Sequence, residues 1–216
     1  MSSWKRPGWT GAALYGVAAA IVGALVTVMS RLQVAHARGS ARVVKALPDG
    51  PVIVISNHVS AADGVLLAMV CRRLGRPARM LAKAEIFKVP LFGRALRKIG
   101  FIPVRRGTEQ AADALDAAAE ALAAGELVAL FPEGRRTRDP NLWPERAKTG
   151  AVRLALRTGA PIVPVAMEGA HRVLGKRNVV VNLITNVIMR PKVATKVGDP
   201  IDVRSLLEGP ETPEEV

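Results

Sequence analysis

The chain has 216 residues, which fits one domain of about 150–200 residues with an appendage better than two full domains. Half of the residues are hydrophobic but only 4% are aromatic, so the chain is poorly supplied with the aromatic faces that stack single-stranded nucleic acid. The net charge of +13 predicts a polyanionic partner, and composition alone does not choose among nucleic acid, an anionic membrane surface and a phosphorylated substrate. The single cysteine, Cys71, excludes an internal disulfide and a thiolate metal cage.

Residues 1–45 are predicted to form a membrane-associating helical segment. The run GAALYGVAAAIVGALVTVM is uncharged, apolar all round and about as long as the 20 residues that a bilayer core requires. Because it is rich in Ala and Gly, a helix that spans the bilayer and one that lies in its surface fit it about equally well. The flanking cations favour a main domain on the cytoplasmic face of the cell membrane; they are Lys5, Arg6, Arg31, Arg38, Arg42 and Lys45. A signal peptide cleaved near Ala35-His36-Ala37 is the alternative, which the long apolar run and Arg31 disfavour.

Past residue 46, apolar runs alternate with helical patterns, which predicts an α/β domain over 46–207 with a mixed, mostly parallel sheet flanked by helices. Strands are expected at 52–56, 79–82, 101–104, 127–131 and 161–167, with a longer strand-like stretch at 178–197. Helices are expected at 61–74, 91–99, 108–124 and 148–158. Residues 208–216 form an acidic tail that we expect to be disordered.

The stretch VIVISNHVSAADG, residues 52–64, places a histidine and a carboxylate at one strand-to-helix corner. Four β-branched residues predict a buried strand, and Ser60 predicts the start of a helix with Asp63 in its first turn. A histidine in this position could serve as a general base, with Asp63 as the acceptor that orients its ring. Alternatively, Asp63 merely completes a capping box with Ser60. Spacing alone leaves both interpretations of His58 and Asp63 open.

Two further loops carry clustered arginines. Arg105 and Arg106 follow the apolar residues of GFIPVRR, residues 100–106, and FPEGRRTR, residues 131–138, contains Arg135, Arg136 and Arg138. Guanidinium groups hold phosphate bidentately, and the turn amides near Gly134 could add donors. Each arginine taken singly could be a solvated surface charge, which is the interpretation favoured for Arg138, but the loops together predict a phosphate site near His58.

These motifs together resemble the glycerolipid acyltransferases of the lysophosphatidic acid (1-acyl-sn-glycerol-3-phosphate) acyltransferase type. Four blocks occur in the order of that family: Asn57, His58 and Asp63; Gly100 to Arg106; Phe131 to Thr137; and the apolar strand Ile162-Val163-Pro164-Val165. Lys83 and the run Lys148-Thr149-Gly150 extend the resemblance, which covers roughly residues 50–170. The chain departs from the family at Arg135, where threonine is usual, and at Thr137, where serine is usual.

The resemblance implies that His58 is the general base and Asp63 its orienting partner. It further implies that a phosphorylated acceptor is held by Lys83, Arg106, Glu133, Gly134 and Arg136. The implied reaction moves a fatty acyl group from acyl-CoA or acyl carrier protein to the free hydroxyl of lysophosphatidic acid, giving phosphatidic acid, with no metal and no cofactor. The expected partners are a lysophospholipid acceptor, the acyl donor and an anionic membrane surface, and no nucleic acid.

Several alternatives remain open at the level of sequence. The acceptor could be glycerol 3-phosphate, another lysophospholipid or a glycolipid. The chain could be a non-catalytic basic domain that binds membrane or nucleic acid, or a hydrolase that uses Ser60 or Cys71 as nucleophile. His36 and His171 are interpreted as structural, Cys71 as a core residue, and Arg94, Arg97 and Lys98 as a helical face toward anionic headgroups.

Overall fold

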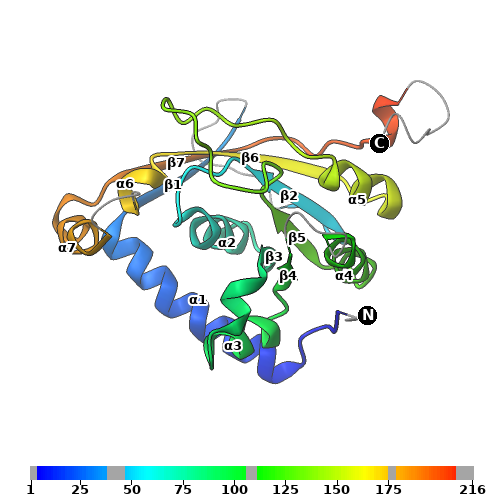
Figure 1. Cartoon of the computed structure of the whole chain (residues 1–216), viewed down its shortest axis with the longest axis horizontal. Helices are drawn as coiled ribbons and strands as arrows, with labels where there is room; N and C mark the ends of the chain where they lie inside the picture. The colour runs from blue at the N-terminus through cyan, green and yellow to red at the C-terminus, as the bar shows by residue number, and fades with distance from the viewer. Residues whose placement is uncertain (1–3, 38–46, 106–110, 175–178, 208–216) are drawn as a thin grey trace.

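The computed structural model describes residues 4–37, 47–105, 111–174 and 179–207. Within them a seven-stranded sheet has the order β1-β7-β6-β2-β5-β3-β4 (Figure 1). The strands are β1 (Arg31–His36), β2 (Val52–Ser56), β3 (Ala78–Lys83), β4 (Ile102–Val104), β5 (Leu127–Leu130), β6 (Ile162–Glu168) and β7 (Lys192–Val197). All neighbouring strands are parallel except β6 and β7, which pair antiparallel. The expected mixed, mostly parallel sheet is therefore confirmed.

Helices cover both faces of this sheet. They are α1 (Trp9–Met29), α2 (Asp63–Arg73), α3 (Phe92–Lys98), α4 (Ala111–Ala123), α5 (Gly150–Thr158), α6 (Ala170–Val173) and α7 (Val179–Met189), with short 3-10 turns at Ala84–Lys88 and Arg204–Leu206. Alternate residues of β2 enter different cores: Val52 and Val54 pack with α1, α2 and α3, whereas Ile53 packs with α4 and α5. Burial on both faces explains why this strand is a continuous run of branched apolar residues.

The elements nearest to the predicted site agree closely with the expectations. The strand expected at 52–56 spans those residues, and the helices expected at 61–74, 91–99, 108–124 and 148–158 are α2, α3, α4 and α5 with slightly different ends. The residues that join the expected N-terminal segment to the domain, 38–46, and the expected tail, 208–216, lie outside the described residues.

Two elements differ from the expectations. The strand expected at 178–197 is wrong in its first part, which is helix α7, and confirmed in its last part, where strand β7 begins after a break at Arg190, whose φ is 42°. The helical pattern expected over residues 1–45 is also too long: α1 ends at Met29, and the next residues form edge strand β1, which pairs with β7. One edge strand of the sheet therefore comes from the segment that was assigned to the membrane.

Candidate active site

The site lies where β2 ends, in the middle of the sheet. Strand β2 is hydrogen-bonded to β6 on one side and β5 on the other, so the loops after all three strands meet at one edge. Loops beyond the carboxyl ends of parallel strands are the usual place for binding and catalysis in such sheets. Asn57 and His58 follow β2, Phe131 to Thr149 follow β5, and Gly169 follows β6.

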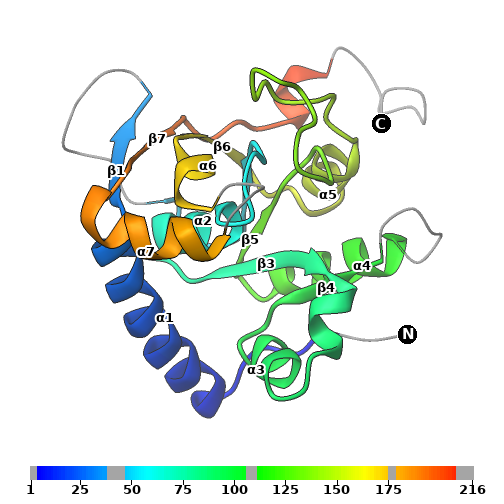
Figure 2. The same cartoon turned by 60° about the vertical axis from the view of Figure 1, so that its left-hand side comes forward.

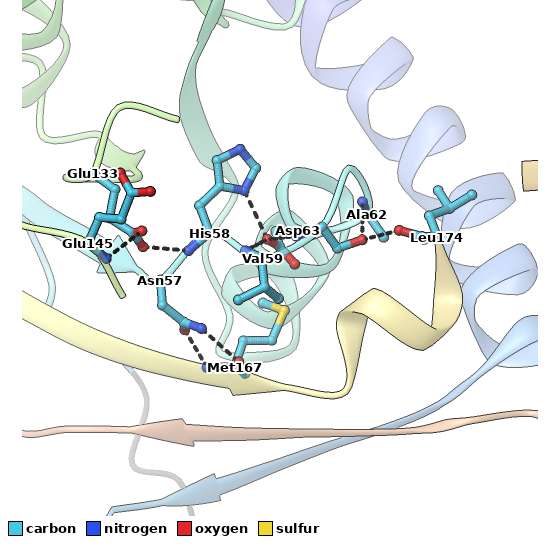
Figure 3. A network of polar contacts seen from close by, with 10 residues as sticks. Asn57, His58, Val59, Ala62, Asp63, Glu133, Glu145, Met167 and Leu174 are labelled. Atoms are coloured by element: carbon cyan, nitrogen blue, oxygen red, sulfur yellow. Dashed lines mark hydrogen bonds and ion pairs between the residues drawn. The ribbon is translucent and has the colours of Figure 1, made fainter. Parts of the chain in front are cut away.

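Asn57 fixes the corner by joining β2 to β6. Its amide nitrogen donates to the carbonyl of Met167 at 2.9 Å, and its amide oxygen accepts the Met167 N–H at 2.8 Å (Figure 3). This side chain mimics a further residue of the β ladder, so the backbone at His58 is held at a defined place as it leaves the sheet.

His58 and Asp63 are in direct contact. His58 Nδ1 lies 2.9 Å from Asp63 Oδ2, and the carboxylate is fully buried. The same oxygen accepts the backbone N–H groups of Val59 at 2.6 Å and Ser60 at 2.7 Å. Asp63, the first residue of α2, therefore holds the turn that precedes the helix and orients the imidazole at once. Its bond to the Ser60 N–H is one half of the expected capping box, so the two interpretations left open by the sequence are compatible.

The contact with Asp63 leaves the other ring nitrogen of His58 available. A carboxylate is an acceptor, so Nδ1 carries the proton and Nε2 presents a lone pair. Nε2 points away from Asp63 (Figure 3), and it makes no hydrogen bond to any residue that the structure describes. The His58 side chain is 13% exposed, and its ring stacks on Phe131 with centroids 4.2 Å apart. The imidazole is thus held on two sides, and Nε2 is left without a hydrogen bond among the described residues.

Glu133 braces this corner through both of its carboxylate oxygens. Oε1 accepts the backbone N–H of His58 at 2.8 Å, and Oε2 accepts the backbone N–H of Glu145 at 2.9 Å. The side chain is buried. Thr137, which replaces the usual serine, is also buried, and its N–H donates to the carbonyl of His58 at 2.7 Å. Both residues join the loop after β5 to the backbone of the histidine.

The cations that the sequence analysis assigned to the phosphate site differ in their exposure and partners. Lys83 is 58% exposed and lies 3.7 Å from Glu85, and Arg136 is exposed. Arg135 is held by an ion pair with Glu145 at 2.6 Å. The backbone N–H of Arg138 and the guanidinium of Arg135 lower the pKa of the Glu145 carboxyl. Arg106, the matching arginine of the second block, lies outside the described residues. The arginine that departs from the family pattern therefore serves to close its own loop.

The comparisons with known proteins decide the family. A profile described as Acyltransferase matches residues 36–168, which is more than half of the chain. The chain belongs to this acyltransferase family. Its relatives include the chloroplastic 1-acyl-sn-glycerol-3-phosphate acyltransferase BAT2 of Brassica napus, 33% identical over 127 residues, or 58% of this chain and 35% of that protein. The 1-acyl-sn-glycerol-3-phosphate acyltransferase of Borreliella burgdorferi is 31% identical over 134 residues, or 61% of this chain and 50% of that protein.

A solved structure agrees with the fold. The 1-acyl-sn-glycerophosphate acyltransferase PlsC of Thermotoga maritima superposes with a TM-score of 0.59 at 23% identity, covering 90% of this chain and 73% of that one. The chain spans between a third and a half of the length of these two sequence relatives.

A cavity of about 340 Å³ opens between the loop after β5 and helices α4 and α5. Phe131, which stacks on His58, forms part of its wall. The rest of the lining is mostly apolar and comes from β3, β4, α4 and α5, and includes Leu81, Val104, Leu115 and Ala151. Lys148 and Arg153 are the cations in the lining. Lys148 lies over Gly134: a Cβ added to that glycine would be 3.3 Å from Lys148 Cε and 3.4 Å from Nζ.

The two nucleophiles considered for a hydrolase are poorly placed in the acyltransferase. Burial raises the pKa of the Cys71 thiol to about 12, and the residue is fully buried in α2. Ser60 is buried too, and its hydroxyl donates to the carbonyl of Leu174 at 2.7 Å while accepting the N–H of Ala62. Both side chains have structural functions that explain their positions.

The two remaining histidines lie on β1 and α6. His36 lies on β1 with Nε2 3.1 Å from Asp199 Oδ1. His171 lies on α6, and burial lowers its pKa. Among the residues that the structure describes, no three His, Cys, Asp or Glu side chains come together as a metal site would require.

Sequence reasoning missed three contributors to this site. They are the ring of Phe131, the ammonium group of Lys148 and the bracing function of Glu133. Phe131 and Lys148 both occur in the motifs that were quoted, but the partners that give them a function are remote in sequence.

Proposed function

We propose that this acyltransferase moves a fatty acyl group from a thioester donor, acyl-CoA or acyl carrier protein, to the free hydroxyl of lysophosphatidic acid, giving phosphatidic acid. The observation that carries the proposal is the His58–Asp63 pair, with Nδ1 bonded to a buried carboxylate and Nε2 unoccupied at the central edge of the sheet. The names of the relatives from Brassica napus and Borreliella burgdorferi support this acceptor.

In the proposed mechanism His58 is the general base. The acceptor hydroxyl gives its proton to Nε2 while its oxygen attacks the carbonyl carbon of the thioester. The tetrahedral intermediate collapses as the carbon–sulfur bond breaks, and the thiol leaves with the proton that His58 returns. Asp63 stabilises the imidazolium between the two proton transfers, because its oxygen lies 2.9 Å from Nδ1. A positioned base of this kind contributes about 10²–10⁴-fold to the rate.

The phosphate of the acceptor is proposed to bind at the cations around Gly134. Gly134 has φ 71° and no side chain, so that phosphate can approach the backbone of the turn. Arg136 and Lys83 are exposed beside this region, Arg106 matches the family pattern, and we add Lys148 because it lies directly over Gly134. Glu133 is proposed to act on the acceptor indirectly, since backbone amides occupy both of its oxygens.

The apolar cavity beside Phe131 is proposed to receive an acyl chain. Its walls are mainly Leu, Val and Ala, and its cations, Lys148 and Arg153, are next to the proposed phosphate region. An apolar cavity with a few convergent polar groups is the usual form of a small-molecule site. Attachment to the cytoplasmic face of the cell membrane would bring both lipid substrates to this cavity.

The function is tested by thiol release from palmitoyl-CoA, measured with and without lysophosphatidic acid, with phosphatidic acid followed by mass spectrometry. We expect release that depends on the acceptor in the wild type and falls by about 10²–10⁴-fold in His58→Ala. His36→Ala is the matched control, because His36 lies on edge strand β1 and pairs with Asp199, another histidine–aspartate contact outside the proposed site. Release without acceptor in the wild type would instead indicate a hydrolase.

The acceptor and donor are tested in the same assay. Glycerol 3-phosphate and a lysophosphatidylcholine replace lysophosphatidic acid in parallel reactions, and palmitoyl-acyl carrier protein replaces palmitoyl-CoA. A kcat/KM highest for lysophosphatidic acid supports the proposal. A higher kcat/KM for another acceptor would support the acyl-transfer reaction and reject lysophosphatidic acid as the preferred acceptor.

A further inference from the structure

Helices α1 and α7 expose apolar side chains at one edge of the molecule. On α1 these are Val17, Ile21, Leu25 and Val28, and on α7 they are Val181, Ile184, Val187, Ile188 and Met189. We call these nine residues the α1–α7 face. The two helices pack against each other, and α7 crosses the C-terminal part of α1 in both views (Figures 1 and 2). The guanidinium of Arg190, just after α7, donates to the carbonyl of Thr27 in α1 at 2.7 Å.

The exposure on α7 is large and follows helical spacing. Ile184 is 65% exposed and Ile188 is 82% exposed, and together with Val181 they recur at the three- and four-residue intervals of one helix face. Asn186 lies on the opposite side, buried, with its amide donating to the carbonyl of Val173 at 2.8 Å. Neither helix contains a charged residue. A contiguous apolar surface of this kind marks an interaction site rather than ordinary solvent-exposed surface.

Helix α1 is held along the domain instead of standing free of it. Gly11, Tyr15, Ala19 and Val26 are buried, and a Cβ at Gly11 would lie 2.4 Å from the carbonyl oxygen of Lys98 in α3. A single helix that crosses a bilayer faces hydrocarbon on all sides over about 20 residues. The docked face of α1 contacts protein, so the apolar face that remains is suited to lie on one leaflet, as an interfacial helix does.

Exposed cations border the α1–α7 face. Arg31 and Arg190 lie where α1 and α7 end, and Arg72 and Arg73 lie in the last turn of α2. A cavity of about 310 Å³ between α1 and α2 is lined by Gly23, Thr27 and these two α2 arginines. Cations near a membrane surface attract anionic headgroups. In a symmetric dimer through this face, the same cations of two copies would be brought together, so the charge favours an anionic bilayer over a second copy.

We propose that α7 is a second membrane-binding helix, which acts with α1 to seat the domain flat on one leaflet of an anionic bilayer. This goes beyond the proposed reaction and does not depend on it. It also gives α7 a connection to the site: α7 holds α6 through Asn186, and the carbonyl of Leu174, just after α6, accepts the hydroxyl of Ser60 beside Asp63.

The test is flotation of the full chain with vesicles of phosphatidylcholine alone or mixed equally with phosphatidylglycerol. We expect the double variant Ile184→Glu, Ile188→Glu to bind the mixed vesicles at least about tenfold less than the wild type, because two apolar side chains leave the bilayer and two anions face it. Leu206→Glu is the matched control, since Leu206 is 67% exposed and lies outside the α1–α7 face. Circular dichroism checks that each variant is folded.

A second pair of measurements distinguishes a lipid bilayer from a second copy of the chain as the partner of the α1–α7 face. Arg72→Gln with Arg73→Gln is expected to weaken binding to mixed vesicles and to leave binding to phosphatidylcholine unchanged. Wild-type flotation by the α7 double variant would overturn the proposal. So would a wild-type dimer in neutral detergent that the double variant converts to a monomer, because the face would then be an interface between copies. Flotation needs no turnover, so these results are independent of the acyltransferase assay.

Discussion

One oxygen of Asp63 orders the histidine and the start of α2 together, which predicts different consequences for the two members of the pair. His58→Ala removes the base, so we expect kcat to fall by about 10²–10⁴-fold. Its cost in stability is limited to the bond to Asp63 and the contact with Phe131. Asp63→Asn weakens charge-assisted bonds to Val59 and Ser60, so it should also lower the free energy of unfolding by about 1.5–3 kcal/mol.

These two variants are compared by steady-state kinetics and urea unfolding in the same detergent. A fall in stability for Asp63→Asn without a fall in kcat would mean that Asp63 is a helix cap alone. Equal kcat in the wild type and His58→Ala would remove His58 as the base.

Glu133 offers a sharper test, since the family pattern and the geometry give it different functions. In Glu133→Gln one amide N–H group must face a backbone N–H of His58 or Glu145, and a mismatch at a buried site costs about 1–3 kcal/mol. We expect kcat to fall by roughly tenfold or more through displacement of His58, while KM for the phosphorylated acceptor does not rise. An increase in KM with unchanged kcat would place Glu133 in direct contact with the acceptor.

Cys71 is predicted to be inert in the folded protein. With a pKa of about 12, about one thiol in 10⁴ is ionised at pH 8, and the thiolate is the reactive form. Iodoacetamide at pH 8 should therefore leave native protein unlabelled and fully active, and label it after unfolding in guanidinium, as intact-mass spectrometry would show. Rapid labelling of native protein with loss of activity would revive Cys71 as a nucleophile.

At the scale of single residues, the sequence predicted the contact between residues close together in the chain and missed the contacts between residues further apart. His58 and Asp63 are five residues apart at one corner, so strand and cap signals were enough to bring them together. Glu133 meets His58 across 75 residues, and Arg135 meets Glu145 across a loop. No local pattern shows that these charges are already engaged, so both were interpreted as charges available for other functions.

At the scale of elements, α7 shows where propensity misleads. Its sequence, VVVNLITNVIM, is dominated by β-branched residues, which favour strands. The helical spacing of Val181, Ile184 and Ile188 is also present, but the polar partner of Asn186 lies on α6 and is invisible to periodicity. The tertiary contact and the apolar face together outweigh the intrinsic preference. The same reasoning explains β1, because each of its residues pairs with a residue of β7 that lies 161 positions further along the chain.

Two glycines of α1 test whether this helix is docked. Gly11→Ala puts a methyl group against the carbonyl of Lys98, where a Cβ would be 2.4 Å away, so overpacking should cost about 1–3 kcal/mol. Gly16 has nothing within 4 Å of its Cβ position, so Gly16→Ala should stabilise the helix by about 0.5–1 kcal/mol. Thermal unfolding in detergent should therefore move in opposite directions for the two variants. Equal shifts would show that α1 does not rest on α3.

Across the whole molecule, the site and a buried ion pair occupy opposite ends of the parallel strands. Arg79 and Glu126, near the starts of β3 and β5, are buried and joined at 3.0 Å, and Arg6 adds a second cation to Glu126. The guanidinium of Arg79 also donates to the carbonyl of Ile99 at 2.8 Å. This cluster therefore joins the N-terminal residues, the end of α3 and the neighbouring strands β3 and β5.

Glu126→Gln leaves Arg79 buried without its counter-ion, which typically costs about 3–5 kcal/mol. For a chain of this size we expect the melting temperature to fall by about 6–20 °C, while kcat at 25 °C is unchanged, because the pair is remote from His58. Asp116→Asn is the control: its ion pair with Arg157 is more than half exposed on both sides and should contribute no more than about 1 kcal/mol. If Glu126→Gln lowered kcat at a temperature where the protein is fully folded, the two ends of the sheet would be coupled, and stability could not be engineered at one end without affecting catalysis at the other.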